Sequence, residues 1–95
     1  MFTVISYDVV EDKQRTKLLK LLRGYGVHVQ YSVFECDLSA EQLVQLKGEI
    51  RQLIDQHTDS VRIYRLDAAA IKRIAVLGLG QVSIQPTYYL PRSGP

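Results

Sequence analysis

The chain has 95 residues, so it accommodates one domain with a modest core and no second domain. Its 46% hydrophobic and 23% charged content excludes a disordered chain and is typical of a folded one. The formal net charge of +2 neither requires nor excludes a nucleic-acid partner, so the local distribution of charge must decide.

The first predicted element is a buried strand that ends in a carboxylate. Residues 2–7 are apolar, β-branched or aromatic except for Ser6, which favours a central strand. Because side chains alternate along a strand, Val4, Ser6 and Asp8 share one face. Asp8 lies where the strand stops, a common place for a functional group. The simpler alternative is that Asp8 solvates the strand end or helps to cap the next helix.

A helix is predicted from residue 13 to about residue 24. Asp12 is a plausible N-cap, and acids at this end suit the helix dipole. Leucines at helical spacing over residues 18–22 predict a buried stripe. Gly24 and Gly26 mark the end, and either could supply a left-handed C-cap.

The charged side of this helix is entirely basic after Asp12. Lys13, Lys17 and Lys20 fall at i, i+4 and i+7, so they line one face and repel one another. A negatively charged partner would relieve that repulsion, although an ordinary solvated face is the alternative. The basic residues of the helix are Lys13, Arg15, Lys17, Lys20 and Arg23.

Two short strands, or one bent strand, are predicted over residues 27–30 and 32–38, with a kink near Tyr31 and Ser32. His28 is expected on the strand surface, because no metal ligand lies near it at suitable spacing. Cys36 is expected to be a small, partly buried hydrophobic residue. It is the sole cysteine, which excludes an intrachain disulfide and fits a reducing cytoplasm.

A second helix is predicted from Ser39 to about His57. Ser39 and Gln42 have the spacing of a capping box. Gly48 inside this helix costs about 1 kcal/mol relative to alanine unless close packing requires it.

The last third of the chain predicts a strand over residues 61–66 and a helical turn through about Arg73. Residues 74–77 could form another strand. Residues 81–85 alternate again, and such a short strand needs a neighbour in its own sheet or in another chain. The expected organisation is one domain over residues 1–87 and a flexible tail over residues 88–95.

The element order is β-α-β-β-α-β, which predicts a ferredoxin-like α+β fold with both helices on one face of an antiparallel sheet. The other face stays open unless something covers it, and a second copy of the chain is the simplest cover. Neither a signal peptide nor a membrane-spanning segment is expected.

Several motifs resemble those of the small CRISPR-associated endoribonucleases, the second of the universal CRISPR adaptation proteins. They are Ser6-Tyr7-Asp8, Arg15-Thr16-Lys17-Leu18, Gly26, and Val29-Gln30-Tyr31-Ser32-Val33-Phe34-Glu35. The resemblance covers residues 2 to about 87.

The resemblance implies a homodimer whose two sheets pack face to face, with residues 81–85 added to the partner's sheet. It implies that the Asp8 residues of the two copies lie together near the two-fold axis and hold a shared divalent metal. Mg²⁺ is the expected cofactor. This chain departs from the family pattern at one position, because many members have arginine where it has His28. A contact with the nucleic-acid backbone at this position would therefore be lost or pH-dependent. The implied nucleic-acid-binding residues are Lys13, Arg15, Lys17, Lys20, Arg23, His28 and Ser32, and the implied dimer-interface residues are Phe34, Val82 and Ile84.

Three functions follow as hypotheses. The first is a magnesium-dependent endonuclease that cleaves RNA or DNA phosphodiesters in CRISPR adaptation and antiviral defence. The second is a non-catalytic homodimeric adapter that binds DNA and bridges copies of the CRISPR integrase. The third, by analogy of fold alone, is a small-molecule sensing domain.

Overall fold

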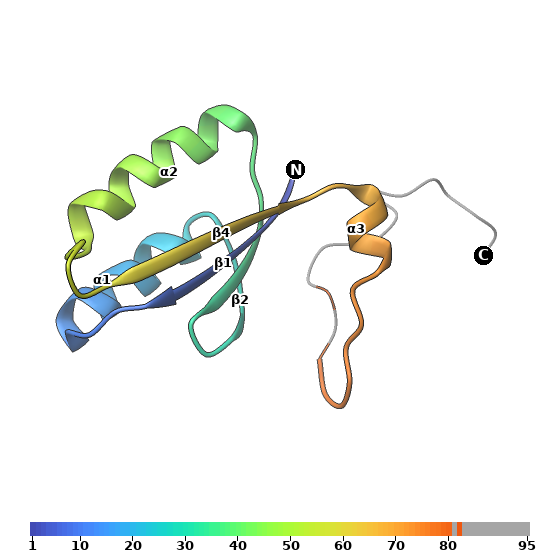
Figure 1. The fold of residues 1–95 in the computed structure, drawn as a ribbon, viewed down its shortest axis with the longest axis horizontal. Helices are drawn as coiled ribbons and strands as arrows, with labels where there is room; N and C mark the ends of the chain where they lie inside the picture. Colours follow the sequence, from blue (N-terminus) through green and yellow to red (C-terminus); the bar gives the residue numbers. More distant parts are fainter. Residues whose placement is uncertain (81, 83–95) are drawn as a thin grey trace.

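The computed structural model describes residues 1–80 and residue 82. Its four strands form one sheet in the order β2-β3-β1-β4, and every neighbouring pair is antiparallel. This arrangement confirms the predicted ferredoxin-like α+β fold (Figure 1). The elements are β1 (Phe2–Asp8), α1 (Asp12–Arg23), β2 (Gly26–Gln30), β3 (Val33–Asp37), α2 (Ala40–Leu53), β4 (Ser60–Leu66) and α3 (Ala68–Lys72).

The core lies between the sheet and helices α1 and α2. Ile5 pairs with Phe34 on one side and with Ile63 on the other, so three apolar side chains stand in a row on the helix-facing side. Phe34 is fully buried in this core, which makes its predicted place at a dimer interface wrong. The core cluster comprises Ile5, Tyr7, Val9, Leu18, Leu22, Phe34, Cys36, Leu38, Leu43, Leu46 and Ile50.

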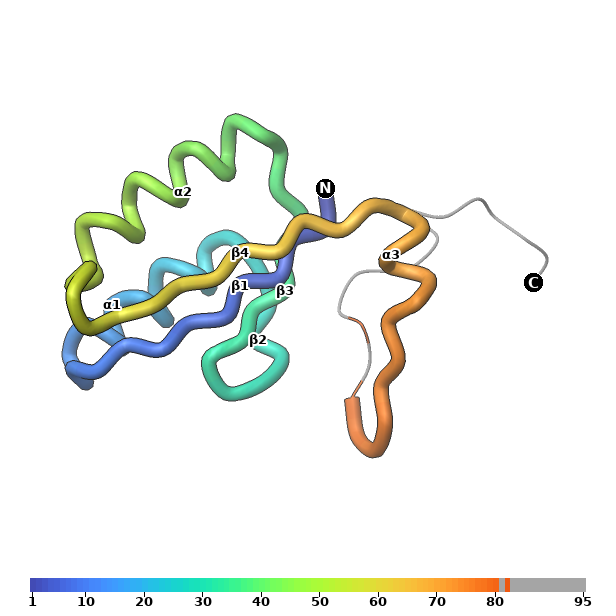
Figure 2. The backbone as a smooth tube through the Cα atoms, viewed as in Figure 1, coloured from blue at the N-terminus to red at the C-terminus, as the bar shows by residue number. Residues whose placement is uncertain are grey.

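Neither α1 nor α2 covers the opposite face of the sheet. The chain after α3 leaves the body of the sheet as an arm (Figures 1 and 2). Residues 74–77, 79 and 80 of this arm line a hollow of about 330 Å³ together with Val4, Val29 and Val33. Leu77 on the arm is 91% exposed. The alternative of a strand over residues 74–77 is wrong, because this stretch pairs with no strand in the described part of the chain.

Both ends of α1 differ from expectation. Asp12 is the first residue of α1, and Glu11 is the N-cap without a side-chain hydrogen bond. Gly24 caps α1 with a right-handed φ of −74°, so no left-handed cap is used. Gly26 belongs to β2, where a Cβ would overlap the carbonyl oxygen of Glu35 in β3. Close approach of two strands, and not a turn, therefore requires glycine at this position.

Helix α2 begins as predicted and ends early. Ser39 and Gln42 form the expected capping box. The helix ends at Leu53 and not near His57, because Asp59 binds the backbone N–H of Asp55 and holds the following loop. The short α3 is confirmed, with Asp67 accepting a capping hydrogen bond from the N–H of Ala70 at 2.8 Å.

Three expectations concern residues at the end of the chain. Residues 81 and 83–85 of the predicted last strand, Ile84 and the tail over residues 88–95 lie outside the described residues. Val82 is half-buried and has no strand assignment. Within the described residues, the model contains no helix with the length and hydropathy needed to cross a bilayer.

Candidate metal and nucleic-acid site

Asp8 stands at the end of β1, on the side of the sheet that α1 and α2 leave uncovered. Its side chain is exposed, and in the sheet it lies opposite Ser60 of β4. On the same face Ser6 lies opposite Arg62, one step back along the two strands. These residues surround a hollow of about 270 Å³, which is lined by Ser6, Tyr7, Asp8, Ser60, Arg62 and Tyr64.

Within the described part of the chain, the carboxylate of Asp8 forms neither a hydrogen bond nor an ion pair. Oxygen donors of this kind suit Mg²⁺, which takes hard oxygen ligands and keeps several waters. No group of three metal-binding side chains occurs among the described residues. Asp8, with the hydroxyls of Ser6 and Ser60 in the same hollow, is therefore a partial oxygen donor set of the kind that Mg²⁺ takes.

Arg62 and Tyr64 are site residues that the sequence reasoning did not select. Along β4 the exposed residues Arg62 and Tyr64 alternate with the half-buried Val61 and Ile63. The alternation of residue types along this strand could have identified them, because the polar and aromatic members of an alternating strand face away from the core. Only the pairing of β4 with β1 shows that this polar face adjoins Asp8.

Three of the predicted nucleic-acid-binding residues, Arg15, His28 and Ser32, come together in a second hollow. The backbone N–H of Tyr7 donates to the carbonyl oxygen of Ser32 at 3.0 Å, which ties the β2–β3 turn to β1. Burial raises the pKa of the Tyr7 hydroxyl, although a hydrogen bond with the Ser32 side chain and the charges of Arg15 and Arg23 oppose that rise. The hollow measures about 120 Å³ and is lined by Tyr7, Arg15, Thr16, Leu19, His28, Tyr31 and Ser32.

Arg15 and His28 also hold the chain together at this site. Arg15 donates to the carbonyl oxygen of Val9 at 2.8 Å and forms an ion pair with Asp12, so it fixes the loop between β1 and α1. The imidazole of His28 stacks on the ring of Phe34 with centroids 4.8 Å apart and an angle of 14°. His28 is exposed on strand β2, as expected.

The remaining basic residues of α1 lie outside both hollows. Lys13, Lys17, Lys20 and Arg23 are exposed. Within the described ranges, none of them forms an ion pair. Their charges are therefore available to a polyanion along the helix, and the structure does not bring them to Asp8.

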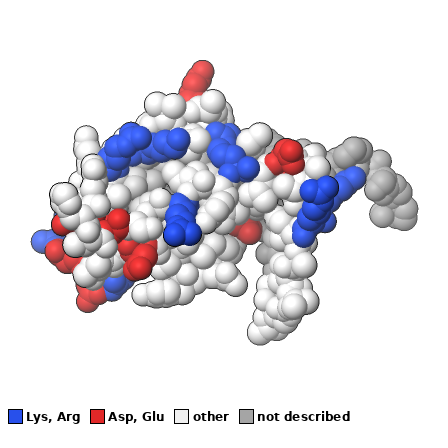
Figure 3. Space-filling view, in the orientation of Figure 1, with Lys and Arg blue, Asp and Glu red and all other residues white. Residues whose placement is uncertain are grey.

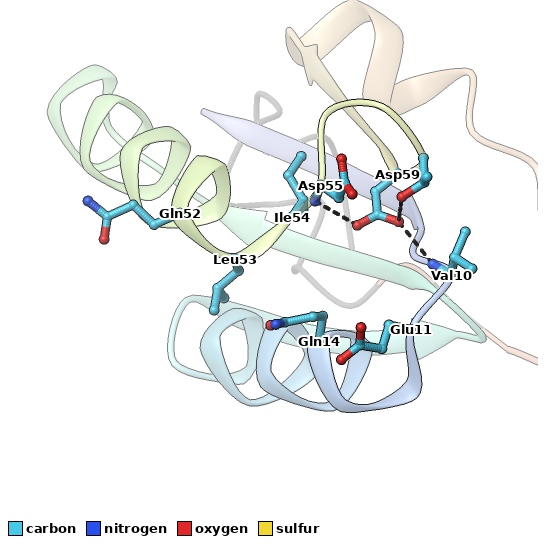
Figure 4. A pocket seen from close by; sticks show the side chains of 9 residues that line it. Val10, Glu11, Gln14, Gln52, Leu53, Ile54, Asp55 and Asp59 are labelled. Carbon is cyan, nitrogen blue, oxygen red and sulfur yellow. Dashed lines mark hydrogen bonds between the residues drawn. The ribbon is translucent and has the colours of Figure 1, made fainter.

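A larger hollow of about 360 Å³ lies between the start of α1 and the loop after α2. Acidic side chains gather at this end of the molecule (Figure 3). Asp59 accepts hydrogen bonds from the N–H groups of Val10 at 3.0 Å and Asp55 at 2.8 Å (Figure 4). These bonds lower the pKa of Asp59, because they favour its charged form. Asp59, one of three acidic residues that line this hollow, thus joins two loops.

Residues 1–74 match the family model described as "CRISPR associated protein Cas2". A protein of Chloroflexus aurantiacus named CRISPR-associated endoribonuclease Cas2 3 is 50% identical over 90 residues, which cover 95% of this chain and 97% of that protein. A CRISPR-associated endoribonuclease Cas2 of Thermus thermophilus is 40% identical over 78 residues, 82% of this chain and 83% of that protein.

Solved structures agree with the sequence comparisons. The crystal structure of Streptococcus pyogenes Cas2 at pH 6.5 superposes with a TM-score of 0.73 at 36% identity, covering 82% of this chain and 100% of that one. A chain of a partial Cas6-RT-Cas1–Cas2 complex superposes with a TM-score of 0.71 at 38% identity, covering 80% and 89%. The order of elements, the motif around Asp8 and these matches agree, and the chain belongs to the Cas2 family of CRISPR-associated proteins.

Proposed function

We propose that this chain is a metal-dependent endonuclease of CRISPR adaptation and defence that cleaves RNA or DNA phosphodiesters at Asp8. Relatives at 50% and 40% identity are named endoribonucleases, which supports the reaction. The observation that carries the site is the unengaged carboxylate of Asp8, exposed at the end of β1 beside Arg62. The adapter is supported by a similar chain in a Cas6-RT-Cas1–Cas2 complex, but that support concerns assembly and not the site at Asp8.

Asp8 holds the metal in this proposal, together with Asp8 of a second copy across a two-fold axis. Two carboxylates brought together by symmetry repel each other unless a cation lies between them. A divalent cation, Mg²⁺ by its preference for oxygen, would supply Lewis acidity toward the phosphodiester and a more acidic bound water. The hydroxyls of Ser6 and Ser60 add further oxygen donors to the wall of the same hollow.

Arg62 and the basic side of α1 hold the nucleic acid. Arg62 lines the hollow of Asp8, where its guanidinium suits a phosphate oxygen next to the metal. Lys13, Lys17 and Lys20 are exposed on α1 and bind the backbone without reading sequence. Arg15 supports this surface by fixing the loop that follows Asp8.

The assembly is part of the proposal. The uncovered face of the sheet and the apolar arm after α3 favour a homodimer, because both leave apolar surface in water. We also propose the CRISPR integrase as a partner in the cytoplasm, since a similar chain occurs in a Cas6-RT-Cas1–Cas2 complex. Val82 and Ile84 remain predicted interface residues.

The test compares cleavage by the wild-type protein and Asp8→Ala with and without Mg²⁺. We expect Asp8→Ala to lower the rate at least about 100-fold while strand binding persists. Glu41→Gln is the matched control, because Glu41 is an exposed acid on α2, away from both hollows. Cleavage by Asp8→Ala at the wild-type rate would refute the assignment of Asp8.

A further inference from the structure

The hollow between β1, α1 and the β2–β3 turn contains features that binding of a phosphate backbone does not require. Its walls include the rings of His28 and Tyr31 and the side chain of Leu19. Arg15 and the hydroxyls of Thr16 and Ser32 supply polar atoms at the same place. A planar, partly polar ligand uses both kinds of group. We propose that this hollow, the base pocket, holds one unpaired nucleobase of the bound strand, an inference that rests on nucleic-acid binding in the proposed function.

The size of the base pocket allows one base to enter in part. It measures about 120 Å³, whereas an engineered apolar cavity of about 150 Å³ in another protein holds one benzene molecule. Because the base pocket is open to solvent on one side, a nucleobase can enter with part of its edge outside. A base pair or a stacked pair of bases exceeds this volume.

Two aromatic rings, those of His28 and Tyr31, line the base pocket. Phe34 covers one face of the His28 imidazole, and Phe34 itself is fully buried. Only the other face or the edge of the imidazole is therefore left for a ligand. Tyr31 is 82% exposed, so most of its aromatic side chain is in contact with water. Stacking on a base would cover that surface.

The turn that carries Tyr31 is fixed before any ligand arrives. Ser32 adopts a left-handed φ of 60°, which a non-glycine residue adopts only when its surroundings hold it. The hydrogen bond from the N–H of Tyr7 to the carbonyl oxygen of Ser32 provides that hold. A pocket with a fixed wall loses little conformational entropy on binding.

Charge identifies the ligand as part of a polyanion. Helix α1 supplies Arg15 to the base pocket and also carries the exposed Lys13, Lys17 and Lys20. A free neutral metabolite would gain nothing from these lysines, whereas a base attached to a phosphate chain would. Tyr7 of β1 lines both the base pocket and the hollow of Asp8, which lie on opposite faces of the sheet.

The experiment measures binding of the wild-type protein, Tyr31→Ala and Tyr31→Phe to a single strand of about twelve nucleotides in EDTA, which prevents cleavage. A series of strands carries one abasic residue at successive positions. We expect one position where base removal weakens wild-type binding at least about fivefold. Tyr31→Ala should show the same loss on the intact strand and no further loss on that abasic strand, while Tyr31→Phe binds as the wild type does.

Two results would overturn the base pocket. One is equal weakening of the intact and abasic strands by Tyr31→Ala, which indicates a backbone contact only. The other is an abasic series without a sensitive position, including the case in which the wild type binds no strand. Tyr31 is exposed, so its variants should keep the wild-type unfolding temperature. Cleavage that survives in Asp8→Ala refutes the metal site and leaves the base pocket standing.

Discussion

Two aspartates at the same end of the sheet have opposite surroundings. Asp59 directly precedes Ser60, which lies opposite Asp8 in the pairing of β4 with β1. The carboxylate of Asp59 accepts hydrogen bonds from two backbone N–H groups and from the hydroxyl of Thr58 at 3.2 Å. The carboxylate of Asp8 accepts none within the described residues.

This difference in hydrogen bonding indicates that Asp59 stabilises the fold, whereas Asp8 is not used in holding the described residues together. A carboxylate that closes a loop contributes to folding, since its hydrogen bonds form only in the native state. A carboxylate held in water beside Arg62 contributes little to folding, yet a rigid strand end aims it at one place. We therefore expect changes at Asp59 to affect stability and changes at Asp8 to affect function.

The largest expected effect is the loss of metal-dependent stabilisation at Asp8. Mg²⁺ that binds only the folded protein should raise its stability by about 2.7 kcal/mol at one hundred times the dissociation constant. Asp8→Ala should abolish this increase, because it removes the carboxylate from every copy. Thermal unfolding in Mg²⁺ and in EDTA at equal ionic strength measures the effect.

Asp59→Ala is the control for the metal experiment. It should unfold at a lower temperature in both buffers and keep the full difference between them. An Asp8→Ala protein that still responds to Mg²⁺ would show that the ion binds elsewhere.

The next effect concerns the lysines of α1. Replacing Lys13, Lys17 and Lys20 together by glutamine removes three exposed charges that form no ion pair in the described structure. If each neutralises one phosphate, the slope of log K against log salt should fall by about two to three units. Titrations of a labelled strand at several salt concentrations measure this slope.

Lys47→Gln on α2 is the comparison for the lysine variant, since Lys47 lies outside both the Asp8 hollow and the base pocket. Its slope should equal that of the wild type. An unchanged slope in the triple variant would place the backbone on another surface.

A smaller effect is the pH-dependent contribution of Asp59. Its pKa is lower in the folded protein than in the unfolded chain because the N–H groups of Val10 and Asp55 bind the charged form. The stabilisation is therefore fully present above the unfolded pKa of about 3.9 and is lost as the pH falls through the lower folded value.

Unfolding temperatures of the wild type and Asp59→Ala should differ clearly at pH 7 and converge below about pH 4. Asp8→Ala should follow the wild type over the same range in EDTA. A constant difference between the wild type and Asp59→Ala would mean that the Asp59 charge is not what holds the two loops together.

The sequence predicted the elements well where a local pattern determines them. Alternation located the strands, and Ser39 with Gln42 located the start of α2. The sequence did not distinguish the roles of glycine, because Gly26 serves a close approach between strands that no local pattern specifies. Phe34 was misplaced for a related reason. Its face is set by pairing with Ile5, a contact across the sheet.

The candidate site was predicted only in part for the same physical reason. Asp8 stood out because it ends a strand, which is a local feature. Arg62 reaches Asp8 only through the pairing of β1 with β4, which joins distant parts of the chain. The second carboxylate of the proposed metal site lies in another copy, so one chain gives no geometry for it.

The smallest expected effect comes from Gly48, which provides a baseline for both aspartates. A Cβ at Gly48 would meet nothing within 4 Å, so packing does not require glycine there. Gly48→Ala should stabilise α2 by about 0.5–1 kcal/mol, because alanine restricts the unfolded chain more and favours a helix. Denaturant titrations should show the same gain in the wild type, Asp8→Ala and Asp59→Ala, since the three sites share no hydrogen-bond partner. Cleavage should not change in the Gly48→Ala protein. A gain that disappears in Asp59→Ala would instead mean that the loop after α2 and the helix unfold as one unit, and it would extend the structural role of Asp59 into α2.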